Sequence, residues 1–202
     1  LQINANGAYT FTPAANYNGP VPVATYTLSD GSSTDSSTLT INVTPVNDDF
    51  TDNNEVISVA EDSGANTGNV IDGSSVDGPV TVTGFTVAGD ATAYNAGDTA
   101  TIAGVGTLQI NSDGGYSFLP VANYNGPVPV ATYTLTDGSS TDTSTLTISV
   151  TPVDDAFTDG NETIAVAEDS GANIGNVIDG ASVDGPVTVT GFTVAGDVTA
   201  YN

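Results

Sequence analysis

Carboxylates are the only side chains in this sequence that carry a charge at neutral pH. The 202 residues include 24 aspartates and glutamates but no lysine, arginine or histidine, which gives a formal net charge of -24. Each carboxylate must therefore be hydrated, hydrogen-bonded or neutralised by a cation from outside the chain. Clustered carboxylates favour Ca²⁺, which takes about six to eight oxygen ligands from carboxylates, carbonyls and water.

Three groups of residues are candidate Ca²⁺ ligands. One group lies around 47–48 and 154–155, one follows the segment 55–60, and one lies in the loop 136–143. The predicted ligands are Asn47, Asp48, Asp154 and Asp155 in the first group, Glu61, Asp62, Glu168 and Asp169 in the second, and Asp137, Asp142, Asp30 and Asp35 in the third. For the third group turn chemistry is an alternative, because Asp-Gly and Ser-rich turns satisfy themselves through side-chain to backbone hydrogen bonds.

Other chemistry finds little support in the composition. Without His, Cys or Lys, the chain lacks the usual bases and nucleophiles that act near neutral pH, and most acids fall in turns and linkers, so we expect no enzyme activity. Direct nucleic-acid binding is excluded because phosphate contacts need Lys or Arg. Binding to an anionic membrane surface is excluded for the same reason, and no apolar run approaches the roughly 20 residues of a membrane span.

The candidate ligands recur because the sequence repeats itself with a period of 107 residues. The segment that begins LQIN at Leu1 returns at Leu108, and the segment that begins TDNNE at Thr51 returns as TDGNE at Thr158. Of the 95 residue pairs related by this shift, 78 are identical. A period of this length is the size of a whole domain and not of a small solenoid unit. Most candidate acids keep an acid in the second copy, whereas Asp49 becomes Ala156 and ranks lower.

Each repeat predicts an all-β domain. Short β-branched and aromatic runs alternate with Gly, Asn, Asp and Ser turns, at the spacing of a β-sandwich with six or seven antiparallel strands. The predicted strands are 55–60, 79–87, 100–110 with a break at Gly104 or Gly106, 115–119, 128–135 and 144–153. Apolar and polar residues alternate along these strands, which predicts that one face of each sheet is buried. The predicted core is Leu108, Ile110, Tyr116, Phe118, Ala131, Tyr133, Leu135, Leu146, Ile148 and Val150.

The strand order predicts how the acids meet. In such a sandwich the first and last strands finish at the same end, so Glu61 and Asp62 should approach Asp154 and Asp155. The Asp137 loop should lie at the opposite end, near Asn47 and Asp48. Each junction between repeats would then gather acids from both neighbouring domains.

Domain boundaries are expected after the last strand, where Pro, Asn and Asp accumulate. Residues 1–49 are then the C-terminal half of one repeat, 50–156 a complete repeat, and 157–202 the N-terminal half of the next. The two ends are complementary halves, which allows head-to-tail pairing of chains into a filament by β-strand complementation. The alternative is a window cut from one continuous polypeptide of tandem repeats.

Three segments carry a family resemblance: DGGYSFLPVANYNG, TYTLTDGSSTDTSTLTISVTPVDDA and AEDSGANTGNVIDGSSVDG. Together they resemble the cadherin-like and immunoglobulin-like tandem extender repeats of giant bacterial surface adhesins of the RTX type. The resemblance implies secreted or cell-surface β-sandwich domains that hold an adhesive tip away from the cell, with Ca²⁺ at their junctions. The aspartate-rich run of such relatives is thinned here to Asp72 and Asp77. A module that binds a glycan or protein ligand is the alternative function.

Overall fold

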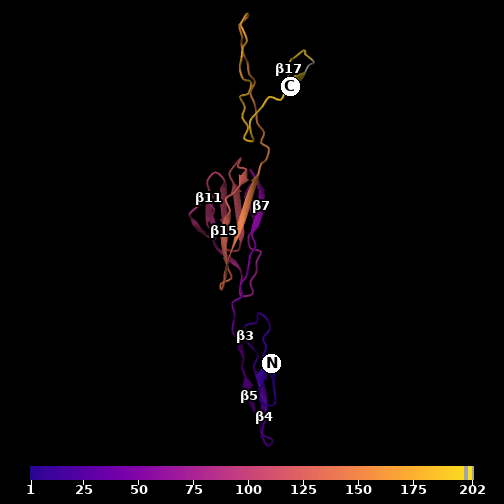
Figure 1. The fold of residues 1–202 in the computed structure, drawn as a ribbon, viewed down its shortest axis with the longest axis vertical. Coiled ribbons are helices and arrows are strands. Elements are labelled where there is room, and N and C mark those ends of the chain that lie inside the picture. The colour runs from indigo at the N-terminus through magenta and orange to yellow at the C-terminus, as the bar shows by residue number, and fades with distance from the viewer. Residues whose placement is uncertain (198–199, 202) are drawn as a thin grey trace.

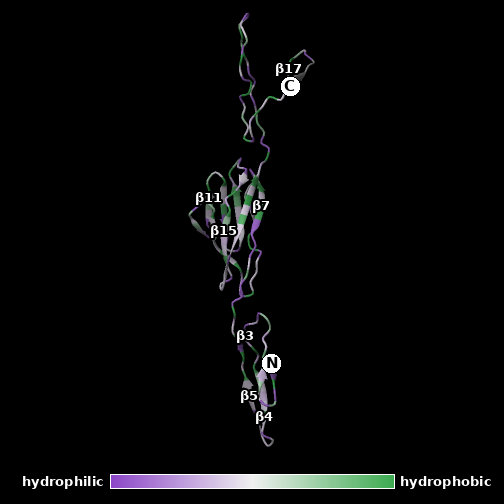
Figure 2. Ribbon diagram, viewed as in Figure 1, coloured by the Kyte–Doolittle hydropathy of each residue, from purple (hydrophilic) through white to green (hydrophobic). Residues whose placement is uncertain are grey.

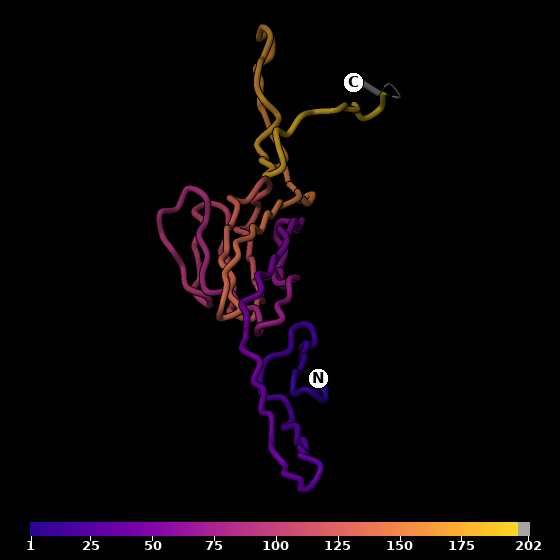
Figure 3. Tube along the Cα trace, turned by 60° about the horizontal axis from the view of Figure 1, so that its bottom comes forward, coloured from indigo at the N-terminus to yellow at the C-terminus, as the bar shows by residue number. Residues whose placement is uncertain are grey.

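The computed structural model describes residues 1–197 and 200–201, and its regular elements there are all β-strands. We call residues 50–156 the bead, residues 1–49 the N-terminal arm and residues 157–197 the C-terminal arm. The bead lies in the middle, and the two arms leave it at opposite ends (Figures 1 and 3). Among the described residues, all buried hydrophobic side chains lie between Phe50 and Val150, so the packed core belongs to the bead.

The larger sheet of the bead has six strands in the order β10-β9-β15-β16-β14, with β7 also pairing to β16. These strands are β7 (Glu55–Ala60), β9 (Thr81–Val87), β10 (Ala93–Asn95), β14 (Gly126–Pro127), β15 (Ala131–Thr136) and β16 (Thr141–Thr151). All pairs are antiparallel except β7 with β16, which run in the same direction with Val59 opposite Val150. The first and last strands of the bead therefore finish at the same end, as predicted.

The smaller sheet has four strands in the order β11-β12-β13-β8, all antiparallel. They are β8 (Asn66–Asn69), β11 (Thr99–Ile102), β12 (Gly106–Ile110) and β13 (Gly115–Pro120). Inward-facing residues of the two sheets form one core, and all ten residues assigned to it by alternation are buried. Tyr133, Phe118 and Leu108 are among its largest fully buried side chains.

Strand boundaries follow local chemistry. The predicted run 100–110 breaks between Ile102 and Gly106. The run 128–135 begins as a strand only at Ala131, two residues after Pro129, which has no N–H to donate to a ladder. Sequence patterns missed β8, β10 and β14, each of which is four residues or shorter.

The arms contain strands but little buried surface. In the N-terminal arm these are β1 (Gln2–Ile3), β2 (Tyr9–Thr10), β3 (Gly19–Pro20), β4 (Ala24–Ser29), β5 (Thr34–Leu39) and β6 (Asn42–Val43), paired two by two. Beyond the bead, β17 (Phe192–Thr193) pairs with β18 (Ala200–Tyr201). Apolar residues occur along both arms as well as in the bead (Figure 2). The described part of the chain includes no helix long and apolar enough to span a membrane.

Candidate metal centre at the repeat junction

The parallel pairing of β7 with β16 places Glu61 beside the chain that leaves the bead. The N–H of Glu61 donates to the carbonyl oxygen of Thr151 at 2.9 Å, which extends the ladder by one residue. The N–H of Val153 donates to Glu61 Oε1 at 2.7 Å, and Asn125 Nδ2 donates to Oε2 at 3.1 Å. Glu61 is only 2% exposed, so these bonds hold a buried carboxylate at the end of the bead.

Asp62 follows in the left-handed region of backbone space, with φ 56°. Aspartate tolerates this conformation better than most residues. Its Oδ1 accepts a hydrogen bond of 2.9 Å from the N–H of Asn123, in the loop after β13. The turn after β7 and the loop after β13 are thereby joined.

The third part of the site comes from across the junction. Asp184, in the C-terminal arm, accepts a 2.7 Å hydrogen bond at Oδ2 from the N–H of Asp155. Glu61, Asp155 and Asp184 each present a carboxylate oxygen, and these oxygens lie within 4.8 Å of one another. The cluster therefore joins the bead to the C-terminal arm, which belongs to the next repeat.

One oxygen of this cluster has no protein partner. Asp155 Oδ2 is buried and accepts no hydrogen bond from any residue that the structure describes. Burial raises the pKa of Asp155, and the negative charges of Asp62, Asp184, Glu61 and Asp154 raise it further. A buried, unpaired acceptor costs free energy, which a bound cation would offset.

The donor set fits a hard divalent cation. It consists of carboxylate oxygens without nitrogen or sulfur ligands, which is the preference of Ca²⁺. Glu61, Asp155 and Asp184 would hold the ion, with Asp62 and Asp154 adding negative charge nearby. The ion would supply the positive charge that the chain lacks.

The other end of the bead repeats part of this arrangement. The N–H of Asp48 donates to Asp77 Oδ2 at 2.6 Å, as Asp155 does to Asp184 one period later. A pocket of about 190 Å³ lies beside them and is lined in part by Asn16 and Asn18, the counterparts of Asn123 and Asn125. This junction therefore combines Asp77 of the bead with Asp48 and the loop of Asn16 and Asn18 from the N-terminal arm.

The Asp137 loop lies at this second end, as predicted, but its carboxylate is engaged by the protein. Asp137 Oδ1 accepts hydrogen bonds from the N–H groups of Ser139 and Ser140, and Oδ2 accepts one of 2.5 Å from Ser75 Oγ. These bonds lower the pKa of Asp137 to about 2. Asp30 makes the same turn bonds with Ser32 and Ser33, and its pKa is also lowered.

The remaining predicted ligands lie in different settings. Asp142 Oδ2 accepts the N–H of Asp52 at 2.7 Å and so ties the entering chain to β16. Asp169 has the same φ of 56° as Asp62, which repeats the turn in the C-terminal arm. Asn47, Asp35, Asp154 and Glu168 are exposed. Metal binding by these residues, and by Asp30, Asp137, Asp142 and Asp169, stays a prediction.

A second acidic cluster was missed by sequence reasoning. Asp52, Glu55 and Asp72 bring carboxylate oxygens within 4.8 Å, and so do their counterparts Asp159, Glu162 and Asp179. In the bead, Asp52 Oδ1 accepts the N–H groups of Asp72 and Gly73, and the hydroxyl of Tyr133 contacts Asp52 and Glu55. These contacts tie the entering chain to the loop after β8 and to the core.

Sequence reasoning missed Asp184 as well as the second acidic cluster. A comparison of the two copies of the repeat could have found both. Asp77 and Asp184 are identical across the repeat, as are all three acids of the second cluster. The acids that we ranked highest were those near strand ends or in Asp-rich runs. Asp184 lies 29 residues from Asp155, so no local spacing links the two.

Comparison with known proteins identifies the type of domain. The family model described as "Cadherin-like domain" matches residues 1–44 and 51–151. A search of curated proteins finds no match. Among solved structures, an endo-fucoidan hydrolase from glycoside hydrolase family 107 matches with 17% sequence identity and a TM-score of 0.34. The match covers 64% of this chain and 19% of that chain, and a likeness this weak carries no argument about activity.

Proposed function

Because this chain belongs to the cadherin-like domain family, we propose that it is a structural extender module, stiffened by Ca²⁺ where one repeat meets the next. The module would belong to a secreted or cell-surface bacterial adhesin or extracellular fibre. Near-identical repeats suit reach and spacing, because chemistry rarely needs the same site in tandem. The elongated arrangement of arms and bead is consistent with this role (Figure 1).

The observation that carries this proposal is the buried oxygen of Asp155 at the junction. It lies among acids from both sides, and the described side chains supply no positive charge to balance them. A cation held by Glu61 and Asp155 of the bead and by Asp184 of the next repeat would bridge the two repeats. Bridging would convert a hinge into a rigid connection.

Thermal unfolding with and without Ca²⁺ tests the site. Ca²⁺ at about 100 times its Kd stabilises a folded domain by about 2.7 kcal/mol, which corresponds to about 10 °C in Tm for a domain of this size. For a Kd on the order of 0.1–1 mM, as in extracellular modules, this ratio corresponds to about 10–100 mM Ca²⁺. An unchanged transition in excess chelator would contradict the proposal.

Asp155→Asn gives a sharper test because its effect should change sign. In chelator the variant should be more stable than the wild type, since it removes one charge from a crowded acidic cluster. In millimolar Ca²⁺ it should be less stable, because a ligand is lost. Asp49→Ala is the matched control, as the second repeat already carries Ala156 there. If Asp155→Asn is more stable than the wild type at all Ca²⁺ concentrations, that result would argue against Ca²⁺ binding at this site.

A further inference from the structure

The chain enters and leaves the bead along two strands that lie side by side. β7 is the first strand of the bead and β16 is the last, and they run in the same direction through six paired positions, from Glu55 opposite Leu146 to Ala60 opposite Thr151. The arms that continue from them extend from opposite ends of the bead (Figures 1 and 3). A pull on both arms therefore draws β7 and β16 in opposite directions along their common axis.

Sliding of two paired strands strains all the bonds between them together. Ladder hydrogen bonds cross from one strand to the other, so a displacement along the strand axis lengthens every one of them. If the first and last strands were antiparallel, the same pull would open their ladder one bond at a time from one end. The parallel pairing therefore makes the strands resist a pull with all their bonds at once.

Side chains extend this ladder on the side where the chain enters. The N–H of Asp52 donates to Asp142 Oδ2 at 2.7 Å. Ser144 Oγ donates to the carbonyl oxygen of Asp52 at 2.9 Å. The N–H of Thr145 donates to Asn54 Oδ1 at 2.8 Å. The segment before β7 is thereby fastened to β16.

The ladder also continues on the side where the chain leaves. Thr151 Oγ1 donates to the carbonyl oxygen of Val59 at 3.1 Å, and the N–H of Val153 donates to Glu61 Oε1 at 2.7 Å. These side-chain bonds all join residues 90 to 92 positions apart, so they follow one register and are strained by the same displacement. We call the β7–β16 ladder together with these side-chain bonds the terminal clamp.

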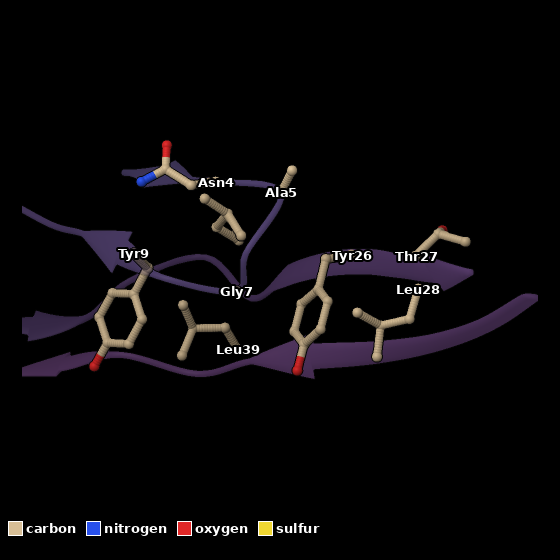
Figure 4. A pocket seen from close by; sticks show the side chains of 9 residues that line it. Asn4, Ala5, Gly7, Tyr9, Tyr26, Thr27, Leu28 and Leu39 are labelled. Carbon is tan, nitrogen blue, oxygen red and sulfur yellow. The ribbon is translucent and has the colours of Figure 1, made fainter. Parts of the chain in front are cut away.

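β7 is the strand of the clamp that has the weaker hold on the bead. β16 is also paired with β15 through six positions and with β14, whereas β7 pairs with β16 alone among the described strands. The hairpin of β15 and β16 recurs in the N-terminal arm, where β4 and β5 pair in the corresponding register. Tyr26, Leu28 and Leu39 lie on one side of that hairpin (Figure 4). Rupture under load should therefore begin with the detachment of β7.

We propose that the bead has a load-bearing function, in which the terminal clamp carries tensile force along the chain and the bonds of Asp52, Asn54 and Glu61 to the leaving strand add to its resistance. This function goes beyond extension and does not depend on a bound cation. Tandem repeats are loaded in series, so each one carries the whole force. The counterparts of these three residues in the C-terminal arm are identical to them.

The force at which a domain ruptures depends on its unfolding barrier and not on its equilibrium stability. One bead should therefore rupture at different forces when it is loaded in different directions. Variants of equal stability should also differ in rupture force if only one of them weakens the clamp.

Single-molecule pulling in two directions tests the clamp. The chain has no cysteine of its own, so exposed residues replaced by cysteine can serve as handles. Asp49→Cys with Thr158→Cys loads the clamp along its axis. Asp49→Cys with Ser139→Cys opens it from one end, because the turn before β16 lies where β7 begins. In chelator the rupture force should be several-fold higher along the axis. Equal forces in the two directions would overturn the proposal.

Asn54→Ala tests the side-chain bonds, because it removes the acceptor of the Thr145 N–H. The matched control is Thr83→Ala, since the Thr83 hydroxyl donates to the carbonyl oxygen of Thr134 at 3.2 Å between β9 and β15, outside the clamp. Both side chains are exposed. Along the axis Asn54→Ala should rupture at a lower force than the wild type, and Thr83→Ala at the wild-type force. An unchanged force in Asn54→Ala, or an equal fall in both variants, would overturn the proposal.

Pulling in Ca²⁺ and in chelator separates the clamp from the proposed metal site. The difference between the two loading directions should be present in both conditions. A difference that exists only in Ca²⁺ would assign the resistance to the ion and overturn the clamp. A difference that is the same in both conditions would support the clamp, whatever the outcome of thermal unfolding with and without Ca²⁺.

Discussion

At the scale of single residues, the surroundings shift the pKa values of different carboxylates in opposite directions. The N–H groups of Ser140 and Ser139 in its own turn, together with the hydroxyl of Ser75, lower the pKa of Asp137 to about 2. Glu55 is different, because burial and the charges of Asp52 and Asp72 raise its pKa, although the Tyr133 hydroxyl acts against this. The phenol has one proton to share among Asp52, Glu55 and Val70.

These shifts predict how stability depends on pH in the absence of divalent cations. A raised folded-state pKa means that the native chain binds more protons just above pH 4.5, so stability should fall as pH rises through the folded-state pKa of Glu55. The pKa of Asp155 is also raised, so this residue too should make stability fall as pH rises. Stability from Asp137 is present above about pH 4 and is lost as pH falls towards 2. Denaturant unfolding in chelator should therefore show greater stability at about pH 5 than at pH 7.

Glu55→Gln isolates one contribution to this profile. The variant should lose part of the decline between pH 5 and pH 7, because glutamine does not titrate. Glu162→Gln is the matched control, since its site in the C-terminal arm is exposed. If stability falls between pH 5 and pH 7 as steeply in Glu55→Gln as in the wild type, the Glu55 cluster does not titrate in this range.

At the scale of elements, β9 organises the larger sheet. It pairs with β15 on one side and with the edge strand β10 on the other, and its register against β15 shifts between Thr134 and Leu135. The rings of Phe85 and Tyr94 stack across β9 and β10 with centroids 5.2 Å apart. Gly84 permits this approach, because an added Cβ would lie 2.5 Å from the carbonyl oxygen of Tyr94.

Gly84→Ala should therefore separate β10 from β9. The contact is with backbone, which cannot move aside as a flexible side chain can, and we expect a loss of about 1–3 kcal/mol in the free energy of unfolding. Gly64→Ala, where a Cβ meets no atom within 4 Å, should change stability by less than about 0.5 kcal/mol. Denaturant midpoints measure both, and equal effects would show that the close approach is unimportant.

At the scale of the whole molecule, charge and repetition act together. A net charge of -24 with no basic side chain favours solubility but drives neighbouring repeats apart. Monovalent salt screens this repulsion over about 8–10 Å without fixing any geometry. A bridging cation at Glu61, Asp155 and Asp184 would instead set the angle between repeats.

Small-angle scattering should distinguish screening from bridging. Millimolar Ca²⁺ should lengthen and stiffen the particle, whereas monovalent salt of equal ionic strength should not. Asp184→Asn should remove the Ca²⁺ response, because it deletes the ligand from across the junction. Identical scattering in Ca²⁺ and chelator would argue against a stiffened junction.

The sequence by itself determined the all-β class, the repeat and the core. Residues such as Leu108, Phe118, Tyr133 and Ile148 were assigned correctly because alternation along a strand is a local property that burial then enforces. The break in the run 100–110 followed for the same reason, since glycine conformational freedom acts within a turn.

Only the tertiary structure decided which acids meet. Glu61 lies 92 residues from Val153, and the parallel register of β7 on β16 brings them together. Asp184 reaches Asp155 by a loop contact between residues 29 positions apart, which alternation along a strand does not encode. Asp137 is the opposite case. The sequence made it a candidate metal ligand, but N–H groups of its own turn donate hydrogen bonds to its carboxylate. Burial and backbone periodicity are local signals, whereas a metal centre depends on distances between segments that only folding sets.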